Sequence, residues 1–190
     1  PIYRRDNAGL FLDVAARSGI GTASQTYLGF GACFFDYDLD GWQDLLVTNG
    51  HIQDDIERRQ AGVSYAEPTL LFHNRGGGDF TEESHQAGNA LTRLRVGRAA
   101  AYGDFDNDGN PDILLLTNSG APALLHNENH TGNAWIRLVL EGKRSNRNAL
   151  GARVQVTVGS RVQTFEVHTG SSYLASQDRR LLVEIGRAHV

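Results

Sequence analysis

The sequence is short of several residues and patterns, and each shortage excludes a class of protein. A single cysteine, Cys33, excludes an internal disulfide framework and a cysteine-based zinc site. No apolar run approaches the roughly 20 residues that a membrane-spanning helix needs, so we expect no membrane span. Methionine is absent, even at position 1, so we expect the 190 residues to be a processed chain or a piece of a longer one.

Acidic charge is concentrated in two short segments. The chain has 22 acidic and 18 basic residues, and the segments 36–44 (DYDLDGWQD) and 104–112 (DFDNDGNPD) contain four aspartates each. The rest of the chain therefore has 14 acidic against 18 basic residues, and the basic ones are scattered rather than gathered in a stripe. We expect no nucleic-acid partner, and we note that two divalent cations would cancel the net charge of −4.

An internal repeat organises the first two thirds of the chain. An offset of 68 residues superposes 36–44 on 104–112, and an offset of 69 superposes GLFLDVAARSG (9–19) on GDFTEESHQAG (78–88). Two nearly equal offsets over such different residues indicate one structural unit used more than once.

Short β-strands are the predicted content of each unit. Apolar runs of four to six residues are bounded by glycine and aspartate, a pattern typical of the blades of a propeller or of a small all-β array. The polar segment 51–67 interrupts this pattern, and we interpret it as an insertion. The predicted strands are 31–35, 44–49, 70–73, 99–102 and 112–117.

The pattern changes near Trp135. Residues 135–142 and 180–186 are predicted strands, and 152–170 is a predicted hairpin that turns at Gly159-Ser160. The return strand of this hairpin keeps its alternation only if a bulge lies between Val162 and Phe165. We predict a repeat region at 1–130, with about two and a half blades, and a separate β module at 131–190.

The two acidic segments carry the chemistry. Each places aspartate at positions 1, 3, 5 and 9 and glycine at position 6, where glycine permits the tight curl that brings alternate carboxylates together. Position 7 would add its backbone carbonyl. Hard oxygen ligands without histidine or cysteine select calcium, so we predict two structural Ca²⁺ sites. The candidate ligands are Asp36, Asp38, Asp40, Trp42 and Asp44 in loop one (36–44) and Asp104, Asp106, Asp108, Asn110 and Asp112 in loop two (104–112).

Alternatives to this interpretation stay open at the level of sequence. The loops are not EF-hands, because their twelfth positions are Val47 and Leu115 instead of glutamate. They could be solvated turns without an ion. His73 and His126 occupy equivalent repeat positions, either as metal ligands or, as we favour, as strand-end side chains bonded to a turn.

Other motifs of the sequence carry less chemistry. Asn129-His130-Thr131 is a glycosylation sequon, and Tyr173 is a candidate for a carbohydrate or partner site. Outside the two loops there is no nucleophile elbow, no HExxH and no phosphate-binding glycine loop, so we expect no enzymatic activity.

These residues resemble a known family. The segments 29–50 and 97–118 are similar to FG-GAP (VCBS-type) repeats, the calcium-loop blades of integrin-like β-propellers. Residues 145–186 resemble the ASPIC/UnbV module that follows such repeats in bacterial secreted proteins and in cartilage acidic protein. The resemblance implies that the aspartates of both loops bind calcium and that the protein is secreted, with no defined catalytic activity. A propeller needs roughly four to eight blades, so we expect open blade edges that invite pairing with another chain.

The sequence therefore predicts an all-β protein, with partial β-propeller-type blades followed by a small β-sandwich-like module. Its predicted function is that of an extracellular or periplasmic calcium-binding adhesion or interaction module, with an unidentified protein or glycan partner. One alternative is a structural subunit that self-assembles into a fibre or sheath. Another is a biosynthetic enzyme domain of the UnbV kind, which would need a pocket of titratable groups outside the calcium loops.

Overall fold

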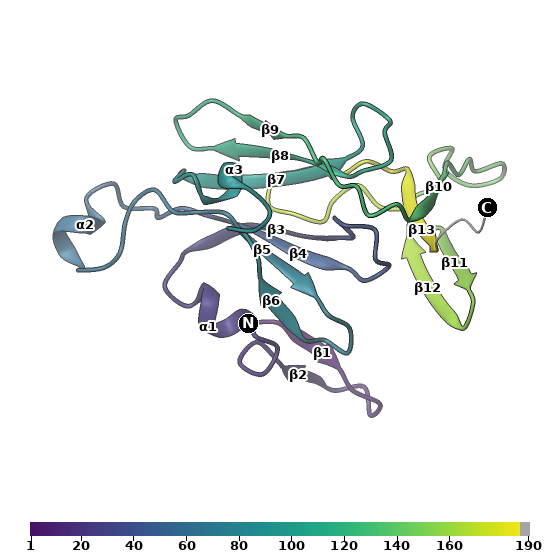
Figure 1. The fold of residues 1–190 in the computed structure, drawn as a ribbon, viewed down its shortest axis with the longest axis horizontal. Helices are drawn as coiled ribbons and strands as arrows, with labels where there is room; N and C mark the ends of the chain where they lie inside the picture. Colours follow the sequence, from purple (N-terminus) through teal and green to yellow (C-terminus); the bar gives the residue numbers. More distant parts are fainter. Residues whose placement is uncertain (187–190) are drawn as a thin grey trace.

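The computed structural model describes residues 1–186, and it is built from short antiparallel strands in five small sheets (Figure 1). This confirms the predicted all-β class. The three helices of residues 1–186 have only four or five residues each, and none is long and apolar enough to cross a membrane. They are α1 (Ile20–Ser24), α2 (Ile56–Arg59) and α3 (Asn89–Thr92).

The two repeat units form two similar sheets, which we call blade one and blade two. Blade one has the strand order β3-β4-β5-β6, and blade two has the order β7-β8-β9. The strands of blade one are β3 (Gly29–Phe35), β4 (Asp44–Asn49), β5 (Leu70–Asn74) and β6 (Phe80–Glu82). Those of blade two are β7 (Gly97–Gly103), β8 (Asp112–Thr117) and β9 (Ala123–Leu125). The sequence therefore predicted both central strands, β4 and β8, to the residue.

Blade one is covered on both faces. Successive side chains of β4 point to opposite faces of the sheet, so Leu46 packs between the two blades with Cys33, Leu71 and Leu115, whereas Leu45 packs on the other side with a second apolar cluster. Burial raises the pKa of the Cys33 thiol to about 12. The members of the second cluster are Ile20, Leu45, Leu70 and Phe72.

The blades meet where β3 approaches β7. A Cβ atom at Gly31 would lie only 2.9 Å from the backbone oxygen of Arg98 and from the backbone nitrogen of Ala100, so only glycine allows this approach. Thr48 adds a hydrogen bond across the contact, from its Oγ1 to the Arg98 carbonyl (3.2 Å). The two blades, and the loops at their ends, are therefore held in a fixed relation.

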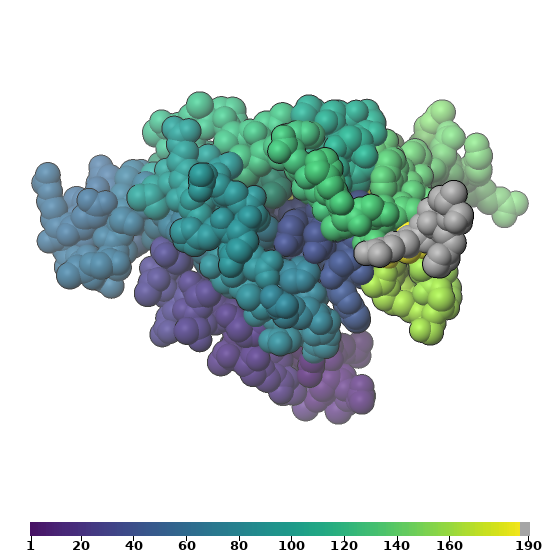
Figure 2. All heavy atoms as spheres, in the orientation of Figure 1, coloured from purple at the N-terminus to yellow at the C-terminus, as the bar shows by residue number. Residues whose placement is uncertain are grey.

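The insertion after β4 and the N-terminal hairpin lie at the outside of the molecule. The segment around α2 projects away from the blades, as Figures 1 and 2 show. At the N-terminus β1 (Tyr3–Arg5) pairs with β2 (Phe11–Asp13) in a separate two-stranded sheet.

The C-terminal segment, residues 127–186, forms two further sheets at the end of the blades where the acidic loops lie (Figure 1). Strand β10 (Ala134–Leu138) pairs with β13 (Leu181–Gly186), and β11 (Arg153–Val158) pairs with β12 (Arg161–Glu166). The hairpin turns at Gly159-Ser160 as predicted. The return strand has no bulge and therefore does not keep its apolar alternation, because the register runs unbroken from Val158↔Arg161 to Arg153↔Glu166.

The residues on the inward face of β12 explain why its register is unbroken. Val162 points to solvent, with 58% of its surface exposed, whereas Gln163 faces the neighbouring sheet and donates from Nε2 to the Glu184 carbonyl (3.1 Å). A glutamine that finds a partner inside removes the need to turn Val162 inward.

Candidate metal centres

Each acidic loop closes the hairpin at the centre of its blade. Loop one joins β3 to β4, with Phe35 opposite Asp44, and loop two joins β7 to β8, with Gly103 opposite Asp112. Position 9 of each loop is therefore the first residue of a central strand of the blade, whereas positions 1 to 8 form the curl itself.

The curl depends on two left-handed residues in each loop. Gly41 and Gly109, at position 6, have φ values of 84° and 96°, as the sequence suggested. Position 4 is also left-handed, with φ 56° at Leu39 and 66° at Asn107. Asparagine is a frequent residue in this conformation and leucine is not, so the sequence signalled the second of these positions only in loop two.

Backbone amides hold the first carboxylate of each loop. Asp36 accepts hydrogen bonds from the backbone N–H groups of Asp40 (3.0 Å) and Gly41 (2.8 Å). In loop two the Gly109 N–H donates to Asp104 Oδ2 (2.9 Å). These bonds fold positions 1 to 6 around the side chains of positions 1, 3 and 5.

The structure brings the predicted carboxylates together in both loops. In each loop the aspartates at positions 1, 3 and 5 can place one oxygen apiece within 4.8 Å of one another. These groups are Asp36, Asp38 and Asp40 in loop one and Asp104, Asp106 and Asp108 in loop two. The spacing suits a single cation with several oxygen ligands.

The ninth-position aspartates belong to a second group in each loop. Asp44 is fully buried and accepts hydrogen bonds from the backbone N–H groups of Tyr37 (3.1 Å) and Asn74 (2.8 Å). Asp112 does the same with the N–H groups of Phe105 (3.1 Å) and Asn127 (2.9 Å). These carboxylates therefore tie the loop to the chain at the end of the blade's third strand, apart from any role toward a metal.

A histidine completes the second group in each loop. His73 Nδ1 lies 3.2 Å from Asp44 Oδ1 and 3.6 Å from Asp38 Oδ2. His126 Nδ1 lies 3.0 Å from Asp112 Oδ1 and 3.6 Å from Asp106 Oδ2. The hydrogen bond to Asp112 raises the pKa of His126. The two histidines occupy equivalent positions in the repeat, and this was the sequence signal for the arrangement. The sequence left open whether they bind a metal or bond to a turn, and either role places the imidazole ring at the loop.

The position-7 residues orient the carboxylates at position 5. The backbone N–H of Trp42 donates to Asp40 Oδ1, and that of Asn110 donates to Asp108 Oδ1, both at 2.8 Å. The metal-ligand role that the sequence assigns to the Trp42 and Asn110 carbonyls stays a prediction.

Electrostatics in loop one favour a bound cation. Burial, together with the like charges of neighbouring aspartates, raises the pKa of Asp36 to about 8 and that of Asp44 to about 7. Burial also raises the pKa of Asp38. A divalent cation would offset the cost of ionising such buried carboxyls.

Unpartnered polar atoms provide an independent test of fit. Asp38 Oδ1 and Asp104 Oδ1 are buried without a hydrogen-bond partner. Buried polar atoms of native proteins nearly always have a partner, and both of these are hard oxygen donors of the kind that calcium prefers. The residues of both loops therefore fit a divalent cation.

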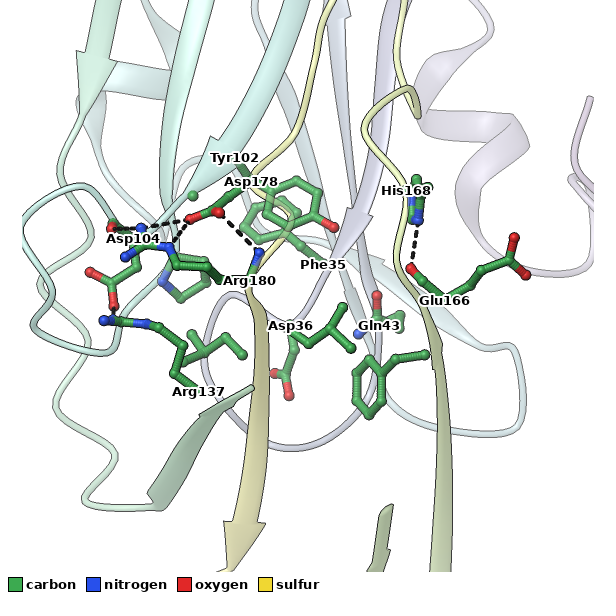
Figure 3. A pocket seen from close by; sticks show the side chains of 15 residues that line it. Phe35, Asp36, Gln43, Tyr102, Asp104, Arg137, Glu166, His168, Asp178 and Arg180 are labelled. Atoms are coloured by element: carbon green, nitrogen blue, oxygen red, sulfur yellow. Dashed lines mark hydrogen bonds and ion pairs between the residues drawn. The ribbon is translucent and has the colours of Figure 1, made fainter. Parts of the chain in front are cut away.

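A small pocket lies between the loops and the C-terminal segment (Figure 3). Its volume is about 60 Å³. Most of the charged groups that Figure 3 labels there are paired, with Arg180 bonded to Asp178 and Arg137 to Asp104. The guanidinium of Arg180 holds the pKa of Asp178 below its usual range, against the opposing effect of burial.

Comparison with known protein families gives two matches. Residues 61–115 match the FG-GAP-like repeat, and residues 142–190 match the family described as ASPIC and UnbV. The first match contains all of loop two with β5, β6 and β7, and the second contains β11, β12 and β13. Both confirm the resemblance seen in the sequence. Loop one lies outside the first match and is linked to it by the internal repeat.

Proposed function

Because this chain carries an FG-GAP-like repeat followed by an ASPIC and UnbV domain, we propose that it is a secreted, calcium-binding module that serves adhesion or interaction. One observation carries the calcium part. The same arrangement of three clustered aspartates, a buried ninth aspartate and a histidine occurs in both repeats, with corresponding distances that agree within 0.2 Å. In this proposal calcium binds at the carboxylates of each loop and holds the end of each blade.

A role without catalysis is part of the proposal. The arginines that line the pocket between the loops and the C-terminal segment are paired with aspartates, Arg137 with Asp104 and Arg180 with Asp178. This pairing supports a structural role for these groups rather than a biosynthetic reaction. Secretion and a protein or glycan partner remain parts of the proposal.

Calcium titration by calorimetry tests the proposal. We expect two calcium ions per chain, with much weaker binding of magnesium, which gives up its water reluctantly. Asp40→Ala should remove the loop-one site and Asp108→Ala the loop-two site. Asp54→Ala, a change at an exposed aspartate of the insertion, is the matched control and should leave both sites intact. Absence of any calcium heat from the unaltered protein would reject the proposal.

Self-assembly is a second candidate, favoured by the open side of blade two. Leu114, Leu116 and Leu124 expose 40%, 42% and 53% of their surface, and β9 is an edge strand with no fourth strand beside it in residues 1–186. Exposed edges and apolar faces favour pairing with another chain. We expect Leu116→Lys to abolish any growth of particle size with protein concentration in light scattering. A size that stays that of a monomer at every concentration would reject self-assembly.

A further inference from the structure

The outer side of loop one is covered by a segment about 90 residues further along the chain. Asn129 Nδ2 and Thr131 Oγ1 donate to the Asp38 carbonyl, at 2.8 and 3.1 Å, and Asn133 Nδ2 donates to the Leu39 carbonyl at 2.7 Å. The amide of the predicted sequon is thus engaged with the loop. All three donors contact backbone oxygens at the left-handed turn of the curl, on atoms other than the clustered carboxylates.

An arginine of the C-terminal hairpin completes this cover. Arg161 of β12 donates from Nη1 to the Asp40 carbonyl (2.7 Å), and its guanidinium lies over the Trp42 ring, 6.0 Å from the ring centroid. It is held in place by an ion pair with Glu184. A Cβ atom at Gly41 would collide with the same guanidinium, so the glycine of the curl also makes room for the C-terminal segment.

Loop two is covered by other residues of the segment, whose contacts include side-chain oxygens as well as a backbone carbonyl. Arg137 and Arg180 both donate to Asn107 Oδ1 at 2.8 Å. Arg180 also donates to the carbonyl of Asp104 at 2.8 Å, and both residues are labelled in Figure 3. Arg137 pairs with the Asp104 carboxylate through Oδ2, which leaves the buried Oδ1 without a partner. A Cβ atom at Gly109 would collide with Trp135.

Contacts beside the loops dock the same segment on the blades. The Tyr102 N–H donates to Gln177 Oε1 (2.7 Å), the Asp178 N–H donates to the Tyr102 carbonyl (3.3 Å), and Tyr173 packs edge-on against Phe30 with 5.5 Å between ring centroids. Tyr173, a sequence candidate for a partner site, is therefore engaged within the chain. The C-terminal segment therefore contacts the blades and both loops.

We propose that the C-terminal segment supplies the outer shell of both cation loops, so that calcium binding and docking of this segment are thermodynamically coupled. Donors on the outward-facing oxygens hold each loop in the curled conformation that the ion requires, which lowers the conformational cost of binding. Linkage requires the converse, that a bound ion stabilises the docked segment by the same factor. The inference rests on the proposed calcium binding and deepens it.

Loop one gives the cleaner test. Its contacts with residues 129–133 are made by neutral side chains, so their removal changes no charge beside the ion. The chain has two tryptophans, Trp42 in loop one and Trp135 against loop two. In a Trp135→Phe background, fluorescence therefore reports loop one alone. We expect the double variant Asn129→Ala/Asn133→Ala to weaken calcium binding at loop one by about 10- to 100-fold, the usual effect of losing outer-shell partners of a metal site. Thr131→Val should have a smaller effect in the same direction.

The matched control is Asn146→Ala. The side chain of Asn146 bonds only within its own surface loop, to Leu150, so calcium affinity should not change. The reverse effect, stabilisation of the docked C-terminal segment by bound calcium, is measured by hydrogen exchange of the peptide 171–178 in the full chain. Calcium should slow its exchange in the unaltered protein and less in the double variant, in which only loop two keeps its full calcium affinity.

The outcomes separate the two proposals. If the unaltered protein shows no calcium response, the calcium function and the coupling both fail. If it binds calcium but the double variant binds equally well, and exchange of 171–178 is independent of calcium, the coupling alone is wrong. Weakened binding in the double variant, with unchanged far-ultraviolet circular dichroism, would support it.

Discussion

Calcium at 1 mM should raise the melting temperature of this protein by about 10–20 °C over its value in EDTA. For a dissociation constant of about 10 μM at each loop, each ion adds about 2.7 kcal/mol to the free energy of unfolding, or about 5 kcal/mol for two. A chain of this size gains roughly 2–4 °C for each kcal/mol. The physical source is the pair of carboxylate clusters, which carry mutual repulsion and unpartnered buried oxygens until a cation binds.

The control for this melt is magnesium at the same concentration. Calcium expands its coordination to suit an irregular oxygen site and magnesium does not, so magnesium should give a much smaller rise. Asp40→Ala and Asp108→Ala should each remove about half of the calcium effect, provided that the blades unfold together. Equal melting temperatures in calcium and in EDTA would mean that the two loops keep their curled conformation without a bound ion.

The strands and the curls of this protein could be predicted because their signals are local. Strands β4 and β8 are apolar runs with a glycine-containing acidic loop on one side, and their bounds match the prediction to the residue. The position-6 glycines and the clustering of positions 1, 3 and 5 follow from spacing alone. The left-handed Leu39 could not be foreseen, since tertiary contacts overrule the preference of a leucine at that position.

The cover over the loops could not be predicted, because it depends on packing between distant segments. Asn129 and Arg161 lie 91 and 121 residues from the loop residues they contact. Asn129 begins a sequon, but no local pattern at either residue indicates a contact with loop one. In the β11–β12 hairpin, strict apolar alternation along the return strand would have required a bulge. The strand has none, because Gln163 points inward and finds a hydrogen-bond partner there. The predicted domain boundary between residues 130 and 131 stays a prediction. Residues 129–133, which span this boundary, contact loop one directly.

Asp44→Ala should lower the free energy of unfolding by about 2–4 kcal/mol even in EDTA, whereas Asp40→Ala should matter only when calcium is present. The reason is the difference in their surroundings. Asp44 is fully buried and satisfies two backbone N–H groups, those of Tyr37 and Asn74, and an unsatisfied buried donor costs about 1–3 kcal/mol. Part of this loss is offset, because removing a buried carboxyl relieves its desolvation. Asp40 accepts one bond, from the Trp42 N–H, at the exposed side of the curl.

Urea unfolding followed by circular dichroism, in EDTA and in calcium, separates the two effects. Asp112→Ala should repeat the result in blade two, because Asp112 holds Phe105 and Asn127 in the equivalent way. If Asp44→Ala unfolds at the wild-type urea concentration in EDTA, its hydrogen bonds do not hold the blade. The expected result instead divides the motif by role: the aspartates at positions 1, 3 and 5 form the cation site, and the aspartate at position 9 closes the blade whether or not an ion is bound. An ion in the curl is then anchored, through that ninth residue, to the central strand of the sheet.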